Sequence, residues 1–392
     1  PIETWIDQGW VKAKGTTLGA DNGMGVAAAM AVLTDPKLTH GPLEALFTVD
    51  EETGMTGAKN LKKGILKGEI LLNMDSEDEG ELYVGCAGGV DVGARRNYKQ
   101  EKTPEGMTAY KLSLKGLRGG HSGLDIHLGK ANANKLMFRF FQQAECDFGM
   151  RIAEYTGGDL RNAIPRESFA TIVVPSIKKA QFEKFMKGYE KMYRAEFKEV
   201  DPDITLIFKV TDAPAKVMNE ADQYRIIRGV FVCPNGVQRM SNSMPGVVET
   251  SNNLSIVRVG NGKFEAYCLC RSSVETAKEA TAWKIAAGFQ LAGCEVELSG
   301  SYPGWKPDMD SAILATMKDT YKKLYGKVPE IKAIHAGLEC GLIYKKFKGI
   351  DMISIGPTIR GAHTPEEKIE IKTTQMFWDL LIDVLNNIPH QE

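Results

Sequence analysis

Three stretches near the start of the chain decide the predicted fold: LGADNG (18–23), PLEALFTVDEE (42–52) and EILLNMDSED (69–78). The second and third stretches open with apolar runs, at Pro42–Val49 and Glu69–Met74, and each run predicts a buried strand. Helices are predicted between and before them, at Leu61–Lys67 and at Asn22–Leu33, where Asn22 is a suitable N-cap. Strands that alternate with helices indicate an α/β fold with a mostly parallel sheet.

The middle of the chain has a different pattern. The stretch AYKLSLK (109–115) alternates between apolar and polar residues, as a half-buried strand does. Two strand-like runs flank Gly260-Asn261-Gly262, which is a strong signal for a β-hairpin. Long helices are expected at 130–145, 178–197 and 275–292. Hairpins together with long helices predict an α+β region with an antiparallel sheet.

The alternation of helices and strands returns after Tyr302-Pro303-Gly304. A helix is expected at 311–325, a buried strand at 351–355 and a closing helix at 373–388. We therefore expect one α/β domain built from residues 1–100 and 301–392, with residues 101–300 inserted into it as a separate α+β domain.

Composition excludes several classes of protein. The 392 residues include 49 Lys and Arg against 50 Asp and Glu, and 43% are hydrophobic. A net charge of −1 gives no overall basic character for binding nucleic acid or an anionic membrane. The longest apolar run, Val26–Leu33, is far shorter than a membrane span. Seven cysteines without a CxxC pair predict reduced, buried thiols in a cytoplasmic protein.

Acidic residues stand where predicted strands end or helices begin. Asp21 precedes the first helix, Glu51 and Glu52 follow one strand, and Asp75 follows the next. Because the carboxyl ends of strands form the ligand crevice of an open α/β sheet, these carboxylates are expected to converge. A bound divalent ion would relieve their repulsion. Taken singly, such residues are more often a helix cap or turn residue, a solvated helix start or part of an acidic surface loop.

Histidine supplies the other expected ligand. His363 lies in the loop that follows the buried strand 351–355, so it is predicted to project from the same kind of strand end as the acids. His335 follows another strand-like stretch, and His121 lies in a Gly-rich turn of the inserted region. His40 and His390 are expected at the surface.

The motifs taken together resemble those of the aminoacyl-histidine dipeptidase family, also called cytosol non-specific dipeptidases. This family stands among the di-metal peptidases, with carboxypeptidase G, aminoacylase and carnosinase. The resemblance covers residues 5–388 in one consistent order. The motifs that carry it are LGADNG, the Glu51-Glu52 pair, NMDSEDEGE (73–81), GCAGG (85–89), GLRGGHSG (116–123), GGDLRNAIPRE (157–167), VVETS (247–251), YPGWKPD (302–308), HAGLECG (335–341) and SIGPTIRGAHTPEE (354–367).

The resemblance implies a catalytic α/β domain with an inserted lid domain that forms a homodimer. It also implies two divalent metal ions, most commonly zinc, with cobalt or manganese as alternatives. Asp21 matches the ligand that bridges the metals, Glu52 and His363 match further ligands of one metal, and Asp75 matches a ligand of the other.

The same resemblance implies how small peptides would be bound and hydrolysed. Glu51 matches a general base that acts with a hydroxide held between the metals. In the inserted region, His121 matches an oxyanion contact, and Asn162 and Arg271 match groups that hold the substrate carboxylate. Gly337 matches a position in a substrate-binding loop.

One departure from the family pattern concerns the first 20 residues. The family has a His-x-Asp motif upstream of LGADNG, and PIETWIDQGWVKAKGTTLGA (1–20) has no histidine. We expect that the sequence is a fragment of a longer protein; a degenerate member of the family is the alternative. In the latter case, His335 is a candidate to replace the absent imidazole.

Other functions stay open at this level. An aminoacylase or a tripeptide aminopeptidase of the same clan would share the ligands and differ only in its pocket. A catalytically inactive metal-binding or dimerisation module is a further alternative. An α/β enzyme without a metal is disfavoured because the sequence contains no GxSxG, phosphate-binding or GxGxxG motif.

Overall fold

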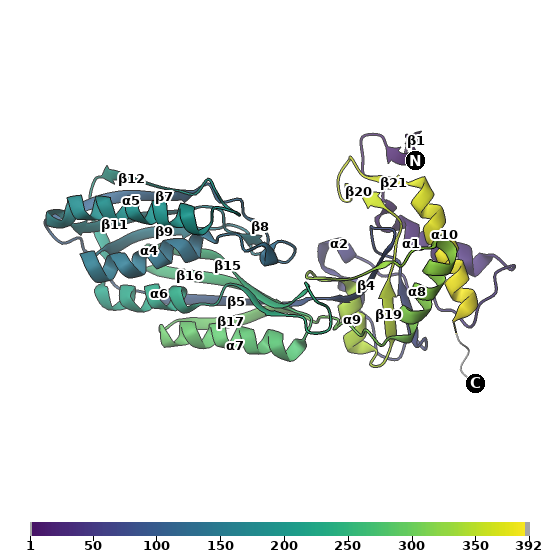
Figure 1. Ribbon diagram of the computed structural model, residues 1–392. Coiled ribbons are helices and arrows are strands. Elements are labelled where there is room, and N and C mark those ends of the chain that lie inside the picture. The colour runs from purple at the N-terminus through teal and green to yellow at the C-terminus, as the bar shows by residue number, and fades with distance from the viewer. Residues whose placement is uncertain (1, 389–392) are drawn as a thin grey trace. The chain divides into compact units, whose positions relative to one another are not determined.

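The computed structural model describes residues 2–388, and the chain divides into two compact units. Unit 1 consists of the described residues up to Ala87 and from Pro303 onward, and unit 2 is Gly88–Tyr302. Unit 2 is therefore inserted in sequence between the two halves of unit 1. Figure 1 shows the elements of each unit, which are described separately below.

Unit 1 contains a four-stranded sheet among its described residues, in the order β18-β4-β19-β3. The pairs β18/β4 and β19/β3 are parallel, and β19/β4 is antiparallel. Helices accompany this sheet, so the α/β prediction is confirmed for this unit. Its elements are β3 (Ile70–Asn73), β4 (Glu81–Cys86), β18 (Glu330–Ile334), β19 (Asp351–Ser354), α1 (Ala20–Thr34), α2 (Glu51–Gly54), α3 (Thr56–Asn60), α8 (Ala312–Tyr325), α9 (Glu339–Lys346) and α10 (Ile371–Asn387).

A second small sheet of unit 1 was not predicted. The short strands β1 (Thr4–Asp7), β2 (Trp10–Ala13), β21 (Lys368–Glu370) and β20 (Ile359–Arg360) pair antiparallel in that order. This sheet brings the start of the chain next to the segment that precedes α10. It thereby connects the surroundings of Asp21 with those of His363.

Two predictions for unit 1 are wrong. The apolar run Pro42–Val49 is not a strand, and Phe47 and Val49 are 51% and 69% exposed. A strand requires a hydrogen-bonded neighbour, and no strand in the described part of the chain pairs with this run. Leu61–Lys67 is a turn and irregular chain instead of a helix, and Gly64 within it has a φ of 77°, which is incompatible with a right-handed helix.

Unit 2 is built on a nine-stranded sheet in the order β12-β7-β11-β9-β15-β16-β5-β17, with β14 also paired to β15. All of its pairings are antiparallel, as the alternating pattern predicted. Its elements are β5 (Gly88–Asn97), β6 (Gln100–Lys102), β7 (Met107–Lys115), β8 (Gly120–His121), β9 (Arg151–Gly157), β10 (Ala163–Ile164), β11 (Ser168–Pro175), β12 (Thr205–Thr211), β13 (Lys216–Met218), β14 (Gly236–Met240), β15 (Val248–Gly260), β16 (Lys263–Ser272), β17 (Glu295–Tyr302), α4 (Ala133–Phe148), α5 (Lys179–Glu196), α6 (Glu220–Val232) and α7 (Glu275–Leu291).

The hairpin between β15 and β16 follows the sequence prediction. Asn261 and Gly262 form its two-residue loop and have φ values of 51° and 75°, which is the conformation that favours Asn-Gly in a tight hairpin. The four long helices of unit 2 pack their apolar faces against the sheet in one large buried cluster. The sheet and helices give the unit a core of its own, as an independent domain requires.

Candidate metal and catalytic site

Three of the predicted ligands lie side by side in unit 1. Asp21 lies at the start of α1, Glu52 in the first turn of α2, and His363 in the loop after β20. His363 Nε2 is 2.8 Å from Asp21 Oδ2 and 3.0 Å from Glu52 Oε2. One ligand atom from each of the three residues lies within 4.8 Å of the others. The structure thus brings together three side chains from separate parts of the chain in a spacing that is compatible with a shared metal ion.

Glu367, which the sequence analysis missed, connects two of these segments. Its side chain is 2% exposed and accepts hydrogen bonds from the backbone N–H groups of Gly19 (2.8 Å) and Asp21 (3.1 Å). Because Glu367 follows His363 by four residues, this contact holds the Asp21 turn against the His363 loop. The second Glu of HTPEE was the only sequence signal, and burial is what distinguishes it from Glu366, which is exposed.

The two other predicted acidic residues lie beside this group. Asp75 follows β3 and shares a side-chain hydrogen bond with Asp21, while Glu51 begins α2 next to Glu52. Burial, followed by the charges of Asp21 and Glu51, raises the pKa of Asp75 to about 8. Burial and the neighbouring Glu52 raise the pKa of Glu51 as well. These shifts are the signature of carboxylates that crowd together without a cation.

The donor set fits a divalent metal ion. Carboxylate and imidazole groups are common ligands of zinc and related ions. In the described part of the chain, no Lys or Arg forms an ion pair with Asp21, Glu51, Glu52 or Asp75. The hydrogen bond to Asp21 raises the pKa of His363. A divalent ion would supply the positive charge that these carboxylates lack and would hold His363 as a neutral ligand.

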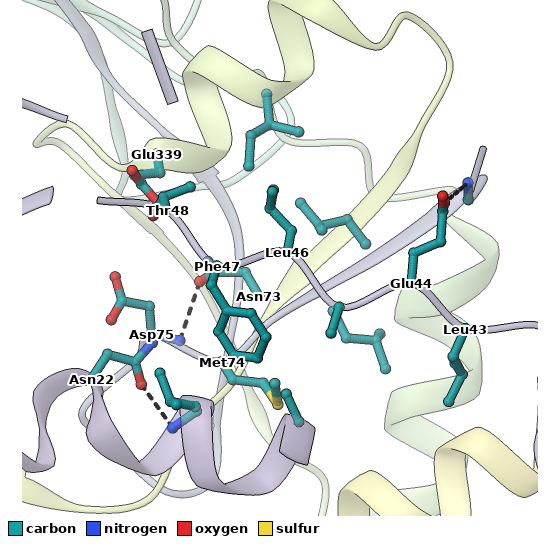
Figure 2. A pocket seen from close by; sticks show the side chains of 18 of the residues that line it. Asn22, Leu43, Glu44, Leu46, Phe47, Thr48, Asn73, Met74, Asp75 and Glu339 are labelled. Carbon is teal, nitrogen blue, oxygen red and sulfur yellow. Dashed lines mark hydrogen bonds between the residues drawn. The ribbon is translucent and has the colours of Figure 1, made fainter. Parts of the chain in front are cut away.

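A further carboxylate, Glu339, faces the same site and was not among the predicted residues. It begins α9, is only 9% exposed, and lines a cavity of about 700 Å³ together with Asp21, Glu51, Glu52 and Asp75. Its Oε2 accepts a hydrogen bond from Thr48 Oγ1 at 2.8 Å. Figure 2 shows Glu339, Thr48 and Asp75 at one end of this cavity. The motif HAGLECG contained this glutamate, but only the fold reveals its burial.

Unit 2 holds three of the predicted substrate contacts. His121 Nδ1 accepts backbone hydrogen bonds from Gly123 (3.2 Å) and Leu124 (3.0 Å), so the neutral ring carries its proton on Nε2. Burial and the nearby charge of Arg271 lower the pKa of His121. His121 is therefore a neutral hydrogen-bond donor near pH 7, with the guanidinium of Arg271 close to it.

Arg271 is an unusually buried cation. It is 5% exposed, its Nη1 donates to Tyr302 Oη at 2.9 Å, and its Nε has no partner among the described residues. No carboxylate in the described residues forms an ion pair with it. Asn162, by contrast, lies in an exposed turn, where its carbonyl accepts from the Ser122 N–H at 2.7 Å, next to His121. Buried and unpaired with an acid, Arg271 is suited to bind an anionic group.

The remaining predicted positions have simpler surroundings. Gly337 is half-buried in the loop between β18 and α9, two residues before Glu339. His335 is 7% exposed and does not belong to the Asp21–Glu52–His363 group. His40 is exposed, as expected, and His390 lies outside the described residues. Among the described residues no helix has the length and apolarity to cross a membrane.

Both the sequence and the fold of the chain match those of known peptidases. The sequence profile of peptidase family M20/M25/M40 matches residues 1–387 of this chain. The cytosol non-specific dipeptidase of Escherichia coli is 44% identical over 391 residues, which are 99% of this chain and 80% of that protein. The solved structure of aminoacylhistidine dipeptidase from Vibrio alginolyticus superposes with a TM-score of 0.97 at 46% identity, covering 100% of this chain and 80% of that one. The aminopeptidase PepT of Bacillus cereus, at 16% identity, has a TM-score of 0.51 over 98% of this chain and 75% of its own, which indicates a similar fold.

Proposed function

This chain belongs to peptidase family M20/M25/M40, and from that premise we propose that it is a metal-dependent dipeptidase. The observation that carries the proposal is the convergence of Asp21, Glu52 and His363 within 4.8 Å, beside the two crowded carboxylates of Glu51 and Asp75. The likeness to the dipeptidases of E. coli and V. alginolyticus over nearly the whole chain supports dipeptides, including those that end in histidine, as the substrates.

Two divalent ions, zinc in the first instance, would be held by the four predicted ligands. Asp21 is proposed to bridge them, with Glu52 and His363 on one ion and Asp75 on the other. The raised pKa of Asp75 supports this assignment, because the protonated acid marks a place where positive charge is needed. When bound, divalent ions in such a site acidify water and polarise the scissile carbonyl.

Glu51 is proposed to move the proton. It is half-buried, neighbours the metal-ligand group and has a raised pKa, so it is a stronger base than an exposed carboxylate. In this role Glu51 takes the proton from the attacking water and gives it to the nitrogen of the leaving amine. The peptide bond then breaks, and Glu51 has both accepted the proton and returned it.

Unit 2 is proposed to act as the lid that binds the rest of the peptide, and unit 1 as the catalytic domain. His121 would donate its Nε2–H to the oxyanion, and Arg271 together with Asn162 would hold the terminal carboxylate. Gly337 would line the substrate loop of unit 1. We also propose that the protein is a homodimer through unit 2 and is cytoplasmic; the free thiols of all seven cysteines support a reducing compartment.

The test measures how the zinc-supplemented protein hydrolyses a panel of substrates: L-alanyl-L-histidine, other dipeptides, a tripeptide and an N-acetyl amino acid. We expect cleavage of the dipeptides and a loss of about 100- to 10,000-fold in kcat with Glu51→Gln, at unchanged zinc content. Glu44→Gln is the matched control, because Glu44 lines the same cavity but accepts hydrogen bonds from the backbone N–H groups of Lys67 and Gly68. Preferred cleavage of the N-acetyl amino acid would assign an aminoacylase instead, and preferred cleavage of the tripeptide an aminopeptidase.

A further inference from the structure

Glu339 is a buried carboxylate, and one of its two oxygens has no hydrogen-bond partner among the described residues. The side chain is 9% exposed, and Thr48 Oγ1 donates to Oε2 at 2.8 Å. The other oxygen, Oε1, is buried and has no hydrogen-bond partner among the described residues. A buried polar atom without a partner is costly, so a position of this kind indicates a ligand that completes it.

The surroundings of Glu339 define the charge of that ligand. The cavity that it lines is also lined by the carboxylates of Asp21, Glu51, Glu52 and Asp75. Lys67 is the one basic side chain among the described residues that line this cavity, and it forms no ion pair with Glu339. The missing partner of Oε1 is therefore expected to be a cationic hydrogen-bond donor.

Glu339 lies outside the compact group of three candidate ligands, as Asp75 does. Asp21, Glu52 and His363 form the group of ligand atoms within 4.8 Å, and Glu339 is not a member of it. Figure 2 shows Glu339 and Thr48 at the same end of the cavity as Asp75, and Thr48 Oγ1 donates to Oε2 of Glu339. In a dipeptide, the cationic donor nearest the scissile bond is the α-ammonium group of the first residue.

We propose that Glu339 is a specificity-determining residue that binds the α-ammonium group of the peptide substrate through Oε1. This inference rests on the proposed dipeptidase function and extends it to the choice of substrate. Peptides with a free α-amine would satisfy the buried oxygen, whereas N-acylated amino acids would leave it unpaired beside an amide carbonyl. The chain would accordingly discriminate against the substrates of an aminoacylase.

The test compares L-alanyl-L-histidine with its desamino analogue, propionyl-L-histidine, in which hydrogen replaces the amine. We expect the wild-type protein to favour the amine in kcat/KM, and Glu339→Gln to reduce that preference about 10- to 100-fold, mainly through KM. The glutamine keeps the size of the side chain and can still accept from Thr48. Glu44→Gln, which removes the same charge elsewhere in the cavity, should leave the preference unchanged.

A second readout separates this proposal from the proposed function. Calorimetry measures the binding of L-alanyl-L-histidine to the Glu51→Gln protein, with and without the additional Glu339→Gln change. Weaker binding of the dipeptide, but not of propionyl-L-histidine, supports the proposal even where no turnover occurs. An unchanged amine preference in binding and in kcat/KM would overturn it. Loss of zinc on Glu339→Gln would also overturn it, by making Glu339 a metal ligand.

Discussion

His363 Nε2 lies 2.8 Å from Asp21 Oδ2, although 342 positions separate the two residues in the chain. Asp21 belongs to the turn that starts α1, and His363 belongs to the loop between β20 and β21. The contact depends on the small sheet β1-β2-β21-β20, which joins the first strands of the described chain to the segment after His363. The candidate metal site is thus a product of long-range pairing within unit 1.

Removing Glu367 should weaken metal binding without touching a ligand. Glu367→Ala deletes the acceptor for the Gly19 and Asp21 N–H groups and so releases the Asp21 turn from the His363 loop. We expect the zinc affinity to fall about 10- to 100-fold, as is typical when a residue that orients metal ligands is lost. Competition with a zinc-sensitive chelator measures this affinity. Glu366→Ala is the control, since Glu366 is exposed, and an equal loss of affinity in both variants would contradict the positioning role.

The metal-free protein should lose stability as the pH rises, because of Asp75. The folded state raises the pKa of this group from 3.8 to about 8, so it binds a proton more tightly than the unfolded chain does. Its contribution to stability is full below about pH 4 and is lost as the pH rises towards about 8. The raised pKa of His363 acts in the same direction, from 6.5 upward.

Thermal unfolding in chelator at pH 5, 7 and 9 checks this expectation. The wild-type Tm should fall more steeply with pH than that of Asp75→Asn, which cannot ionise at this position. The Asp50→Asn variant controls for loss of an exposed carboxylate from the same region. If the Tm of wild type and of Asp75→Asn changed with pH in the same way, the expected effect of the charges around Asp75 would be refuted.

His121 should act as a neutral donor with its proton on Nε2. His121→Ala is expected to lower kcat about 100-fold, in the range of about 10²–10³ for loss of one oxyanion donor. His121→Gln, which keeps a side-chain N–H donor, should recover part of that loss. Steady-state kinetics on L-alanyl-L-histidine measures both variants, with the exposed His127→Ala as control. Activity of His121→Ala equal to that of the control would remove His121 from the reaction.

The sequence predicted much of the architecture because its signals were local. The antiparallel sheet of unit 2 followed from alternation and from the Asn261-Gly262 turn, and both are properties of neighbouring residues. The run Pro42–Val49 has the same local signal for a strand but does not form one. Its pattern carries no information on whether a partner strand is available, and in the described chain none pairs with it.

Some residues of the candidate site could be predicted from the sequence and others could not. Asp21 and His363 could be selected because each lies beside a predicted helix or strand, and the structure brings them together with Glu52. The strand that was expected to precede Glu52 does not form, so its selection rested on the family resemblance. Glu339 and Glu367 could not be selected, because their importance lies in burial and in which atoms their oxygens meet. A glutamate in a charged loop looks the same in the sequence whether it is solvated or enclosed.

The most direct test of the account is the metal content of the purified chain, measured by elemental analysis after exposure to zinc and exhaustive dialysis. We expect about two zinc ions per wild-type chain and the loss of at least one in His363→Ala. His40→Ala, which alters an exposed histidine, should retain the wild-type content. A wild-type chain without zinc, or equal zinc contents in wild type and His363→Ala, would contradict the claim that Asp21, Glu52 and His363 form a metal site.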